Sequence, residues 1–202
     1  VQPSYQFIKA LLNNEKGLHI DKDHFMTISP DEGSMNRAIY LANVLGVDMG
    51  MYYKRLDYSR YVNGRHPIAA YEFLGPKIEG KDMILIDDMI SSGDTIIKIA
   101  SLLKEKGAGR VYICSTFGFF TDGLDKFDDA YKKGYFDKLL TTNLVYQSPE
   151  LLEKPYYISC DMSKYIALII DTLNHDTSVS HLLNPVAVSY THLRAHETKA
   201  NL

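Results

Sequence analysis

One stretch of the sequence, residues 83–98 (MILIDDMISSGDTIIK), constrains the fold of this chain more than any other. It opens on the apolar residues 83–86, a short run that predicts a buried strand. Two carboxylates, Asp87 and Asp88, stand where we expect that strand to end. After a loop of small residues, apolar residues recur at helical spacing until Gly107. The stretch therefore predicts a strand, a short loop and a helix in succession.

The loop between that strand and that helix has the chemistry of a phosphate site. Its residues are Ser91, Ser92, Gly93, Asp94 and Thr95. Backbone N–H groups of such a loop bind phosphate together with the unpaired donors and the partial positive charge of the first helical turn. The two aspartates would repel a phosphate, so they suit the hydroxyls of an attached sugar or a bridging cation. For the loop alone, a solvated turn with an N-capping side chain is the plain alternative.

Two familiar nucleotide-binding motifs are missing from the sequence. No Gly-Lys-Ser/Thr follows the loop, so the lysine that reaches the phosphates in a P-loop is absent. No G-x-G-x-x-G follows a predicted strand either. The stretch therefore predicts a phosphate site of a different kind.

The rest of the chain alternates helical and strand-like patterns. Helices are predicted over residues 4–14, 33–45, 124–133 and 162–173, and strands over residues 25–28, 49–53, 111–116, 139–142 and 156–159. Residues 54–80 show no clear pattern, which indicates either a functional segment or an element that the pattern misses. The alternation predicts an α/β fold with a mostly parallel sheet and helices on both faces. In such sheets, ligands bind beyond the carboxyl ends of the strands.

Composition limits the partners and the compartment. A chain of 202 residues can bury one full core, and a net charge of −3 gives no electrostatic reason to expect nucleic acid or an anionic membrane as a partner. Cys114 and Cys160 both lie in apolar runs, so we expect buried free thiols in a reducing compartment. Because no apolar run approaches membrane-spanning length and no signal-peptide pattern opens the chain, we expect a cytoplasmic protein.

Five strings of the sequence carry a resemblance to a known family. Residues 84–96 (ILIDDMISSGDTI) resemble the ribose-5-phosphate-binding signature shared by phosphoribosyltransferases and ribose-phosphate diphosphokinases. Residues 27–38 (TISPDEGSMNRA) resemble the pyrophosphate loop of the diphosphokinases, and residues 51–55 (MYYKR) resemble the start of their catalytic flexible loop. Residues 141–143 (TTN) and 178–183 (SVSHLL) are similar to further stretches of that family. The resemblance covers residues 1–185 and favours the diphosphokinases.

The resemblance implies a fold and an activity. Residues 1–185 would form a phosphoribosyltransferase-like three-layer domain, the C-terminal half of a diphosphokinase. The intact enzyme would use Mg²⁺ to transfer diphosphate from ATP to ribose 5-phosphate, giving AMP and 5-phosphoribosyl 1-diphosphate. At full length it would be a homo-oligomer. The motifs of the N-terminal half, which supplies most of the adenine site in this family, are not in the sequence, and this argues against activity of the chain alone.

The resemblance also implies how the substrates are held. Residues 91–95 would grip the 5-phosphate through their backbone amides, while Asp87 and Asp88 would fix the ribose hydroxyls. The loop that would hold the transferred diphosphate consists of Asp31, Glu32 and Gly33. Its Asp31 would lie near the Mg²⁺. This chain has Ser34 where the family usually has a second glycine, which narrows the backbone angles available there.

The basic residues that follow the predicted strand at 49–53 fit the family in part. Lys54 matches the lysine that would close over the phosphates and stabilise the charge of the diphosphate group during its transfer. The family has an arginine two positions further on, where this chain has Leu56. Arg55 would take that role, or else Arg60 or Arg65 would do so from the longer loop. Without the resemblance, a lone basic pair at a strand end is usually solvated.

Residues 186–202 fall outside the resemblance. They have no clear amphipathic period and resemble translated vector sequence, so we expect a non-native tail without a role in function. His192 and His196 have the spacing of a metal-binding pair. Without a third ligand or an H-E-x-x-H pattern, chance explains that spacing better.

Two other functions stay open at the level of sequence. A phosphoribosyltransferase that uses phosphoribosyl diphosphate needs only one domain. Such an enzyme would have a segment that recognises the base, located after the phosphate loop. No such segment can be identified near residues 116–121. The second alternative is a non-catalytic, ribose-phosphate-binding regulatory module. The presence of Lys54 argues against a homologue that is specialised for a role without catalysis.

Overall fold

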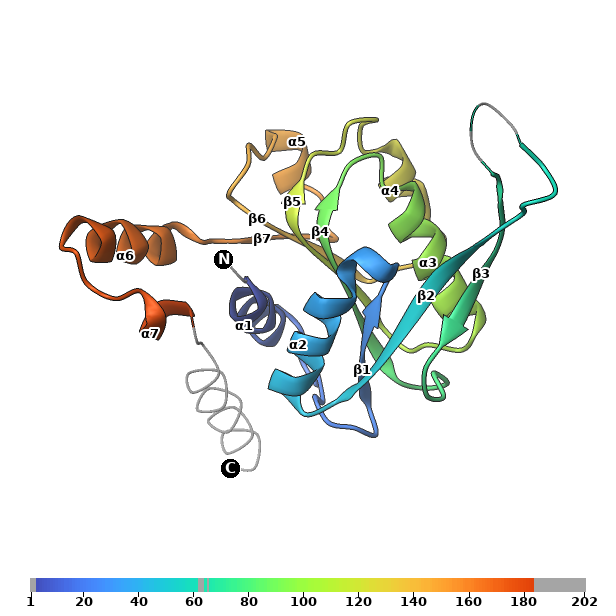
Figure 1. Ribbon diagram of the computed structural model, residues 1–202, viewed down its shortest axis with the longest axis horizontal. Coiled ribbons are helices and arrows are strands. Elements are labelled where there is room, and N and C mark those ends of the chain that lie inside the picture. The colour runs from blue at the N-terminus through green and yellow to red at the C-terminus, as the bar shows by residue number, and fades with distance from the viewer. Residues whose placement is uncertain (1–2, 62–63, 65, 184–202) are drawn as a thin grey trace.

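The computed structural model describes residues 3–61, 64 and 66–183, and this part of the chain contains a seven-stranded sheet. The strands lie in the order β3-β2-β1-β4-β5-β6-β7 (Figure 1). Their bounds are β1 Phe25–Ser29, β2 Asp48–Leu56, β3 Ile68–Leu74, β4 Asp82–Ile90, β5 Val111–Gly118, β6 Lys138–Thr142 and β7 Tyr157–Cys160. Neighbouring strands are parallel except β2 and β3, which run antiparallel at one edge. The predicted α/β fold with a mostly parallel sheet is confirmed.

Helices cover both faces of this sheet. Their bounds are α1 Ser4–Asn14, α2 Met35–Leu45, α3 Asp94–Glu105, α4 Asp125–Lys132, α5 Pro149–Leu152, α6 Ser163–Asn174 and α7 Ser180–Leu183, and the 3₁₀ helix η1 spans Glu32–Ser34. The side chains of α1 and α2 join one buried cluster, and those of α3 and α4 join another on the opposite face. The sheet is therefore the middle of three layers (Figure 1).

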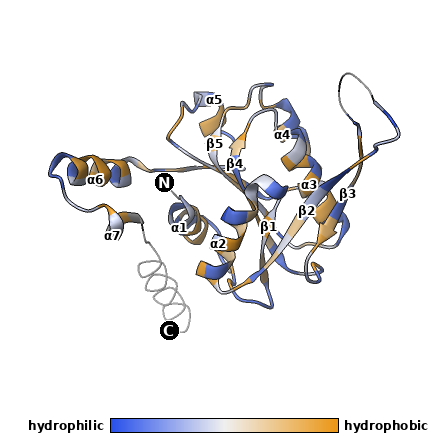
Figure 2. Cartoon of the chain, in the orientation of Figure 1, coloured by the Kyte–Doolittle hydropathy of each residue, from blue (hydrophilic) through white to orange (hydrophobic). Residues whose placement is uncertain are grey.

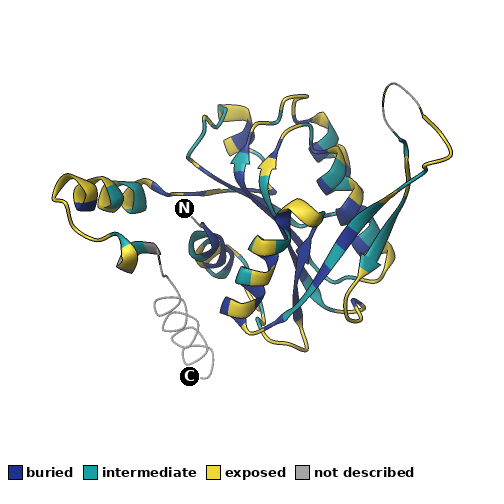
Figure 3. Cartoon of the chain, viewed as in Figure 1, coloured by how far each residue is buried: buried dark blue, intermediate teal, exposed yellow. Residues whose placement is uncertain are grey.

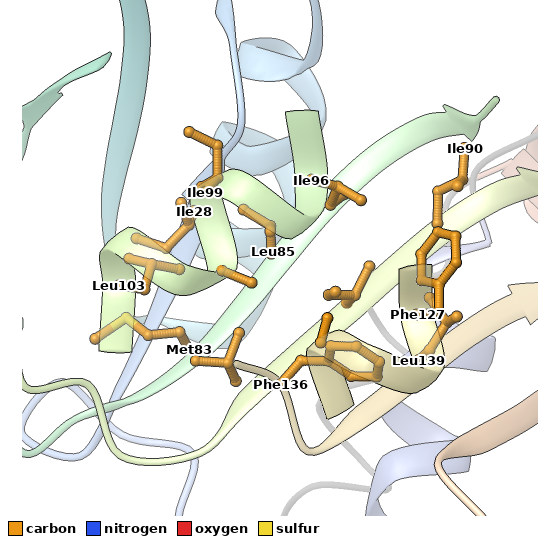
Figure 4. Packing of buried hydrophobic residues seen from close by; sticks show 14 of the residues in the cluster. Ile28, Met83, Leu85, Ile90, Ile96, Ile99, Leu103, Phe127, Phe136 and Leu139 are labelled. Carbon is orange, nitrogen blue, oxygen red and sulfur yellow. The ribbon is translucent and has the colours of Figure 1, made fainter. Parts of the chain in front are cut away.

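β4 shows how the sequence divides its apolar residues between these layers. Because successive side chains of a strand point to opposite faces, Met83 and Leu85 pack with α3, whereas Ile84 and Ile86 pack with α1 and α2. Figure 4 shows the α3 side of this packing, with Leu103 beside Met83. Figure 3 shows the central strands as the most buried part of the molecule. A strand buried on both faces reads as the continuous apolar run seen in the sequence.

Residues 54–80 contain a strand that the sequence pattern did not reveal. β2 continues to Leu56, and the chain returns antiparallel to it as β3. The side chains of β3 are half-buried or exposed, since it is the edge strand. Its sequence, IAAYEFL, therefore needs neither a continuous apolar run nor a strict alternation.

The central strand is longer than predicted. We expected it to end at the two carboxylates, but β4 passes Asp87 and Asp88 and ends at Ile90. That expectation is wrong because β5 supplies main-chain partners beyond the apolar run, with Asp87 opposite Ser115 and Ile90 opposite Gly118. Backbone pairing does not require an apolar side chain, so the polar end of the strand stays in the sheet.

The last long helix is present as predicted but does not close the core. Thr172 is the residue of α6 that is buried, whereas Leu168, Ile170 and Leu173 are 42 %, 61 % and 60 % exposed. α6 lies away from the sheet (Figure 1), and hydrophobic colouring marks part of its ribbon (Figure 2). Within the described residues, the helix therefore has an apolar face without a matching apolar surface.

Three other expectations concern the cysteines, membrane-spanning helices and the C-terminal tail. Cys114 and Cys160 are free and buried, as predicted. In the part of the chain that the structure describes, no helix is long and apolar enough to cross a membrane. The expected tail, residues 186–202, lies outside the described residues together with its two histidines.

Candidate functional site

The two predicted loops meet at the point where the strand order changes direction. From β1 the chain moves to β2 on one side, and it later enters β4 on the other side of β1. Loops that leave the carboxyl ends of two such neighbouring strands diverge, and a crevice opens between them. A cleft of about 330 Å³ lies at this point. Its lining residues are Asp31, Gly33, Ser34 and residues 87–96.

The start of α3 forms one wall of the cleft. Gly93 caps this helix with a φ of +85°, in the left-handed region that glycine adopts readily. A Cβ at Gly93 would lie 2.3 Å from Cζ of the buried Phe127, so the loop also needs a residue without a side chain there. The first residues of α3, Asp94, Thr95 and Ile96, line the cleft. Their N–H groups lack partners within the helix, so this wall has the kind of donors that bind anions in proteins.

Asp94 places a negative charge at this helix start, and neighbouring groups hold that charge. Lys126 Nζ lies 2.8 Å from Asp94 Oδ1, and Ser92 Oγ donates to Asp94 Oδ2 at 3.0 Å. The Lys126 hydrogen bond and then the Ser92 hydrogen bond lower the pKa of Asp94. Lys126 Nζ also lies 2.8 Å from Asp122 Oδ2, so the lysine offsets the charge of Asp94 in part.

Asp87 is the most perturbed carboxyl in the cleft. Its pKa is raised to about 6, first by burial and to a smaller extent by the nearby Asp88 and Asp31 carboxyls. Ser34 Oγ donates to Asp87 Oδ1 at 2.6 Å, and the Asp88 N–H donates to the same oxygen at 2.8 Å. Both hydrogen bonds favour the ionised form and partly oppose the effect of burial. Asp87 is therefore a carboxyl that two donors hold in place and whose pKa lies above its ordinary value.

Asp88 has a more open setting. Its Oδ2 lies 3.4 Å from Arg37 Nη2, and its Oδ1 accepts from the Met89 N–H at 2.9 Å. The side chains of Arg37 and Asp88 are 39 % and 41 % exposed. An ion pair this exposed contributes little to stability, so Asp88 is available to a ligand.

The predicted diphosphate loop lies opposite, at the end of β1. Ser29 Oγ donates to the main-chain oxygen of Asp31 at 2.6 Å, which shapes the turn into η1. Asp31 and Gly33 line the cleft, whereas Glu32 is exposed and is not among the lining residues. Lys54 Nζ lies 3.7 Å from Asp31 Oδ2. A carboxylate and an ammonium group thus stand together beside the cleft.

The structure separates the two basic residues that the sequence placed together. Lys54 and Arg55 are consecutive in β2, so their side chains point to opposite faces. Arg55 Nε donates to Glu72 Oε1 at 2.6 Å, and Tyr53 donates to the other oxygen of Glu72. Arg55 therefore does not lie at the cleft in this structure, and Lys54 alone of the pair contacts Asp31. Arg65, another proposed arginine, lies outside the described residues.

Sequence reasoning did not assign roles to Ser34 and Arg37. Both hold carboxylates of the cleft, although they are 53 and 51 residues away from Asp87 and Asp88. Their spacing of three residues at the start of a predicted helix places both on one face of it. That spacing was the available signal, but it does not say which carboxylates the face meets.

The expected Mg²⁺ can be compared with these residues. In the part of the chain that the structure describes, no group of three or more His, Cys, Asp or Glu side chains is placed to hold a metal ion. Mg²⁺ is commonly held by one or two carboxylates, substrate phosphates and water rather than by a full protein cage. Asp31 is a partly exposed carboxylate, 33 % accessible, at the edge of the cleft. It fits a shared site of that kind.

The fold defines a phosphoribosyltransferase-like α/β domain, with the small-residue loop 91–95 and the cleft at the switch point of the sheet. The chain belongs to the phosphoribosyl synthetase-associated domain family, which matches residues 65–184. The resemblance to the ribose-phosphate diphosphokinases, also called pyrophosphokinases, is confirmed by similarity to proteins of that name.

Two relatives and one solved structure illustrate this similarity. The ribose-phosphate pyrophosphokinase of Vibrio parahaemolyticus is 29% identical over 163 residues, which are 80% of this chain and 49% of the relative. That of Thermococcus kodakarensis is 31% identical over 121 residues, 59% of this chain and 39% of the relative. The phosphoribosylpyrophosphate synthetase of Mycobacterium smegmatis superposes with a TM-score of 0.65 at 21% identity, over 87% of this chain and 51% of that one, which shows the common fold. The chain spans about half the length of the curated relatives it matches.

Proposed function

We propose that this chain is the ribose-phosphate-binding half of a ribose-phosphate diphosphokinase. The whole enzyme would transfer diphosphate from ATP to the 1-hydroxyl of ribose 5-phosphate and release AMP. The proposal extends to this chain the activity for which its relatives are named, ribose-phosphate pyrophosphokinase.

One juxtaposition carries the proposal. The start of α3, an anion-binding wall, and the Asp87 carboxylate, an acceptor for hydroxyls, line the same cleft of about 330 Å³. A sugar phosphate offers both groups at a fixed separation, a phosphate at one end and hydroxyls at the other. Neither inorganic phosphate nor a free sugar would use the whole surface.

Different groups of this chain would bind the phosphate, the ribose and the transferred diphosphate, according to their charge. Backbone N–H groups at residues 91–95 would bind the 5-phosphate, and Asp87 and Asp88 would accept hydrogen bonds from the ribose hydroxyls. Lys54 would reach across from β2 to the transferred diphosphate and stabilise its charge in the transition state. Phosphoryl transfer relies on such positioning and electrostatics, so no covalent nucleophile is needed.

Mg²⁺ would be the cofactor, held by Asp31 together with phosphate oxygens and water. When bound, it would neutralise charge on the diphosphate and orient it. Lys54 lies 3.7 Å from Asp31, so the chain already balances this carboxylate with a cation. A partner domain would bring ATP.

The proposal is tested by titrating the protein with ribose 5-phosphate and with inorganic phosphate in separate calorimetric experiments. We expect ribose 5-phosphate to bind more tightly by at least about tenfold, since each added hydrogen bond to a charged group contributes on the order of 1.5–3 kcal/mol. Asp87→Asn should remove most of this preference. The matched control is Asp129→Asn, which changes an exposed aspartate of α4 paired with Lys132. Equal affinity for both ligands in the unmodified protein would overturn the proposal.

A second measurement separates the diphosphokinase from the alternatives. In the complete enzyme, Lys54→Ala should lower AMP formation from Mg²⁺-ATP and ribose 5-phosphate by about 10²-fold, the typical effect of removing a donor that stabilises transition-state charge. A phosphoribosyltransferase or a regulatory module would show no AMP formation to lose.

A further inference from the structure

Ser34 is a buried hydroxyl at the edge of the cleft that none of the proposed roles uses. The residue is 1% exposed, although it lines the cleft. Its Oγ donates to Asp87 Oδ1 at 2.6 Å, a contact between residues 53 positions apart. The loop after β1 thus holds a carboxylate that β4 supplies.

The hydrogen bonds on Asp87 are asymmetric. Oδ1 receives both the Ser34 hydroxyl and the Asp88 N–H, at 2.6 and 2.8 Å. Among the described residues, no N–H or serine hydroxyl donates to Asp87 Oδ2, although the Asp88 carboxyl also interacts with Asp87, and the residue lines the cleft. Rotation about the terminal bond of an aspartate has only a broad preference of its own. Two donors on one oxygen therefore fix the carboxylate plane and leave the other oxygen available.

The neighbouring carboxylate is held less firmly. Arg37 approaches Asp88 at 3.4 Å, and both side chains are about 40 % exposed, at 39 % and 41 %. Exposed pairs of this length impose little order. Ser34 is by contrast short, buried and within a normal hydrogen-bond distance, so it restricts its partner more strongly.

We propose that Ser34 is a positioning residue for the sugar, whose hydroxyl holds Asp87 Oδ1 so that Oδ2 accepts a hydrogen bond from a ribose hydroxyl. The inference rests on the proposed function of the cleft. It means that the loop expected to carry diphosphate also sets the geometry of the sugar site on β4. Ser34 would contribute to recognition of the sugar and nothing to recognition of the phosphate, which the start of α3 binds.

The experiment compares two ligands across variants of the protein. Ribose 5-phosphate and inorganic phosphate are titrated at pH 8 into the unmodified protein, Ser34→Ala, Asp87→Asn and the double variant. The control is Ser101→Ala, which removes another buried serine hydroxyl, one that bonds Lys98 within α3. Thermal unfolding of each sample shows that it is folded. The backbone at Ser34, with φ −96°, does not oppose alanine.

We expect Ser34→Ala to weaken ribose 5-phosphate binding about tenfold and to change phosphate binding less than about twofold, as loss of one charge-assisted hydrogen bond implies. In the Asp87→Asn background, the same substitution should change ribose 5-phosphate binding less than about twofold, because the effect passes through Asp87. If Ser34→Ala does not fold, Ser34→Cys keeps a side-chain donor, although a weaker one, and should give a smaller loss of the same kind.

Three results would overturn the inference alone. These are an unchanged affinity for ribose 5-phosphate, an equal loss for both ligands, and a loss that persists when Asp87 is already asparagine. If the unmodified protein does not prefer ribose 5-phosphate over phosphate, the proposed function fails first, and the inference fails with it.

Discussion

Lys54 Nζ lies 3.7 Å from Asp31 Oδ2, which joins β2 to the loop after β1 at the edge of the cleft. The two side chains are 31 % and 33 % accessible, so the pair contributes about 0–1 kcal/mol to stability. Its position beside the cleft is therefore more consequential than its strength. Removing the lysine should change binding without unfolding the protein.

We predict that Lys54→Ala weakens binding of inorganic diphosphate about tenfold or more, because a partly buried cation next to the cleft is lost. Arg55→Ala should change the affinity less than about twofold, since Arg55 lies on the other face of β2 and pairs with Glu72. Calorimetric titration of both variants, with circular dichroism to confirm folding, measures the difference. A comparable loss in Arg55→Ala would mean that the hairpin rearranges when diphosphate binds.

Asp87 should make the protein less stable as pH rises. Burial raises its folded-state pKa to about 6, above the ordinary 3.8, so the folded protein binds more protons between these values than the unfolded chain does. Its contribution to stability is therefore fully present below about pH 4 and is lost as pH rises to about 6. At pH 7, Asp87→Asn should increase the free energy of unfolding by up to about 3 kcal/mol, because the shift is about two pKa units.

Urea unfolding of Asp87→Asn and the unmodified protein from about pH 2 to pH 8 measures this effect as the difference between the two curves. Asp94→Asn provides a contrast of opposite sign. The pKa of Asp94 is lowered by its hydrogen bonds from Lys126 and Ser92, so its contribution is present above about pH 4 and is lost on acidification. A pH-independent difference between the Asp87 variant and the unmodified protein would contradict the assignment.

Strands with buried side chains could be predicted from the sequence, whereas the half-exposed edge strand could not. The central apolar run, Asp87 and Asp88, and the small-residue loop were placed correctly next to one another because local order alone fixes that arrangement. The edge strand β3 was missed because its half-exposed side chains put no periodic constraint on the sequence. Once the end of β2 at Leu56 was also missed, nothing in the pattern indicated that Lys54 and Arg55 face opposite ways.

The contacts that organise the cleft were beyond prediction for a different reason. Ser34 and Arg37 meet Asp87 and Asp88 only because β1 and β4 are neighbours in the sheet. Which strands become neighbours depends on the topology of the whole chain and not on any short stretch of it. In the sequence, Ser34 was therefore only a departure from the family pattern. In the structure, its hydroxyl donates a hydrogen bond to Asp87.

Mg²⁺ should bind together with diphosphate and not before it. A single partly exposed carboxylate, Asp31, cannot hold this cation alone, and in the described part of the chain no three acidic or metal-binding side chains converge. We expect Mg²⁺ to strengthen diphosphate binding in the unmodified protein and Asp31→Asn to reduce that gain by about tenfold or more, as loss of a ligand group does. Calorimetric titration of diphosphate with and without Mg²⁺ measures the gain. Strong heat from Mg²⁺ alone would point to a site elsewhere.

Gly93 should be the least replaceable residue of the phosphate loop. Gly93→Ala forces a side chain into a left-handed backbone at φ +85° and places its Cβ 2.3 Å from Phe127 Cζ. The backbone term costs about 1–2 kcal/mol, and overpacking against Phe127 adds about 1–3 kcal/mol. Phosphate binding should weaken as well, because the start of α3 must shift.

The matched control for Gly93→Ala is Gly46→Ala at the end of α2. Gly46 has a similar φ of +68°, but its Cβ would meet nothing within 4 Å, so only the backbone cost of about 1–2 kcal/mol applies. In a Phe127→Leu background, Gly93→Ala should cost less than it does alone, because the shorter side chain leaves room for the methyl group. Urea unfolding of the five proteins gives both differences. Equal costs at Gly93 and Gly46 would mean that the contact with Phe127 does not constrain the loop.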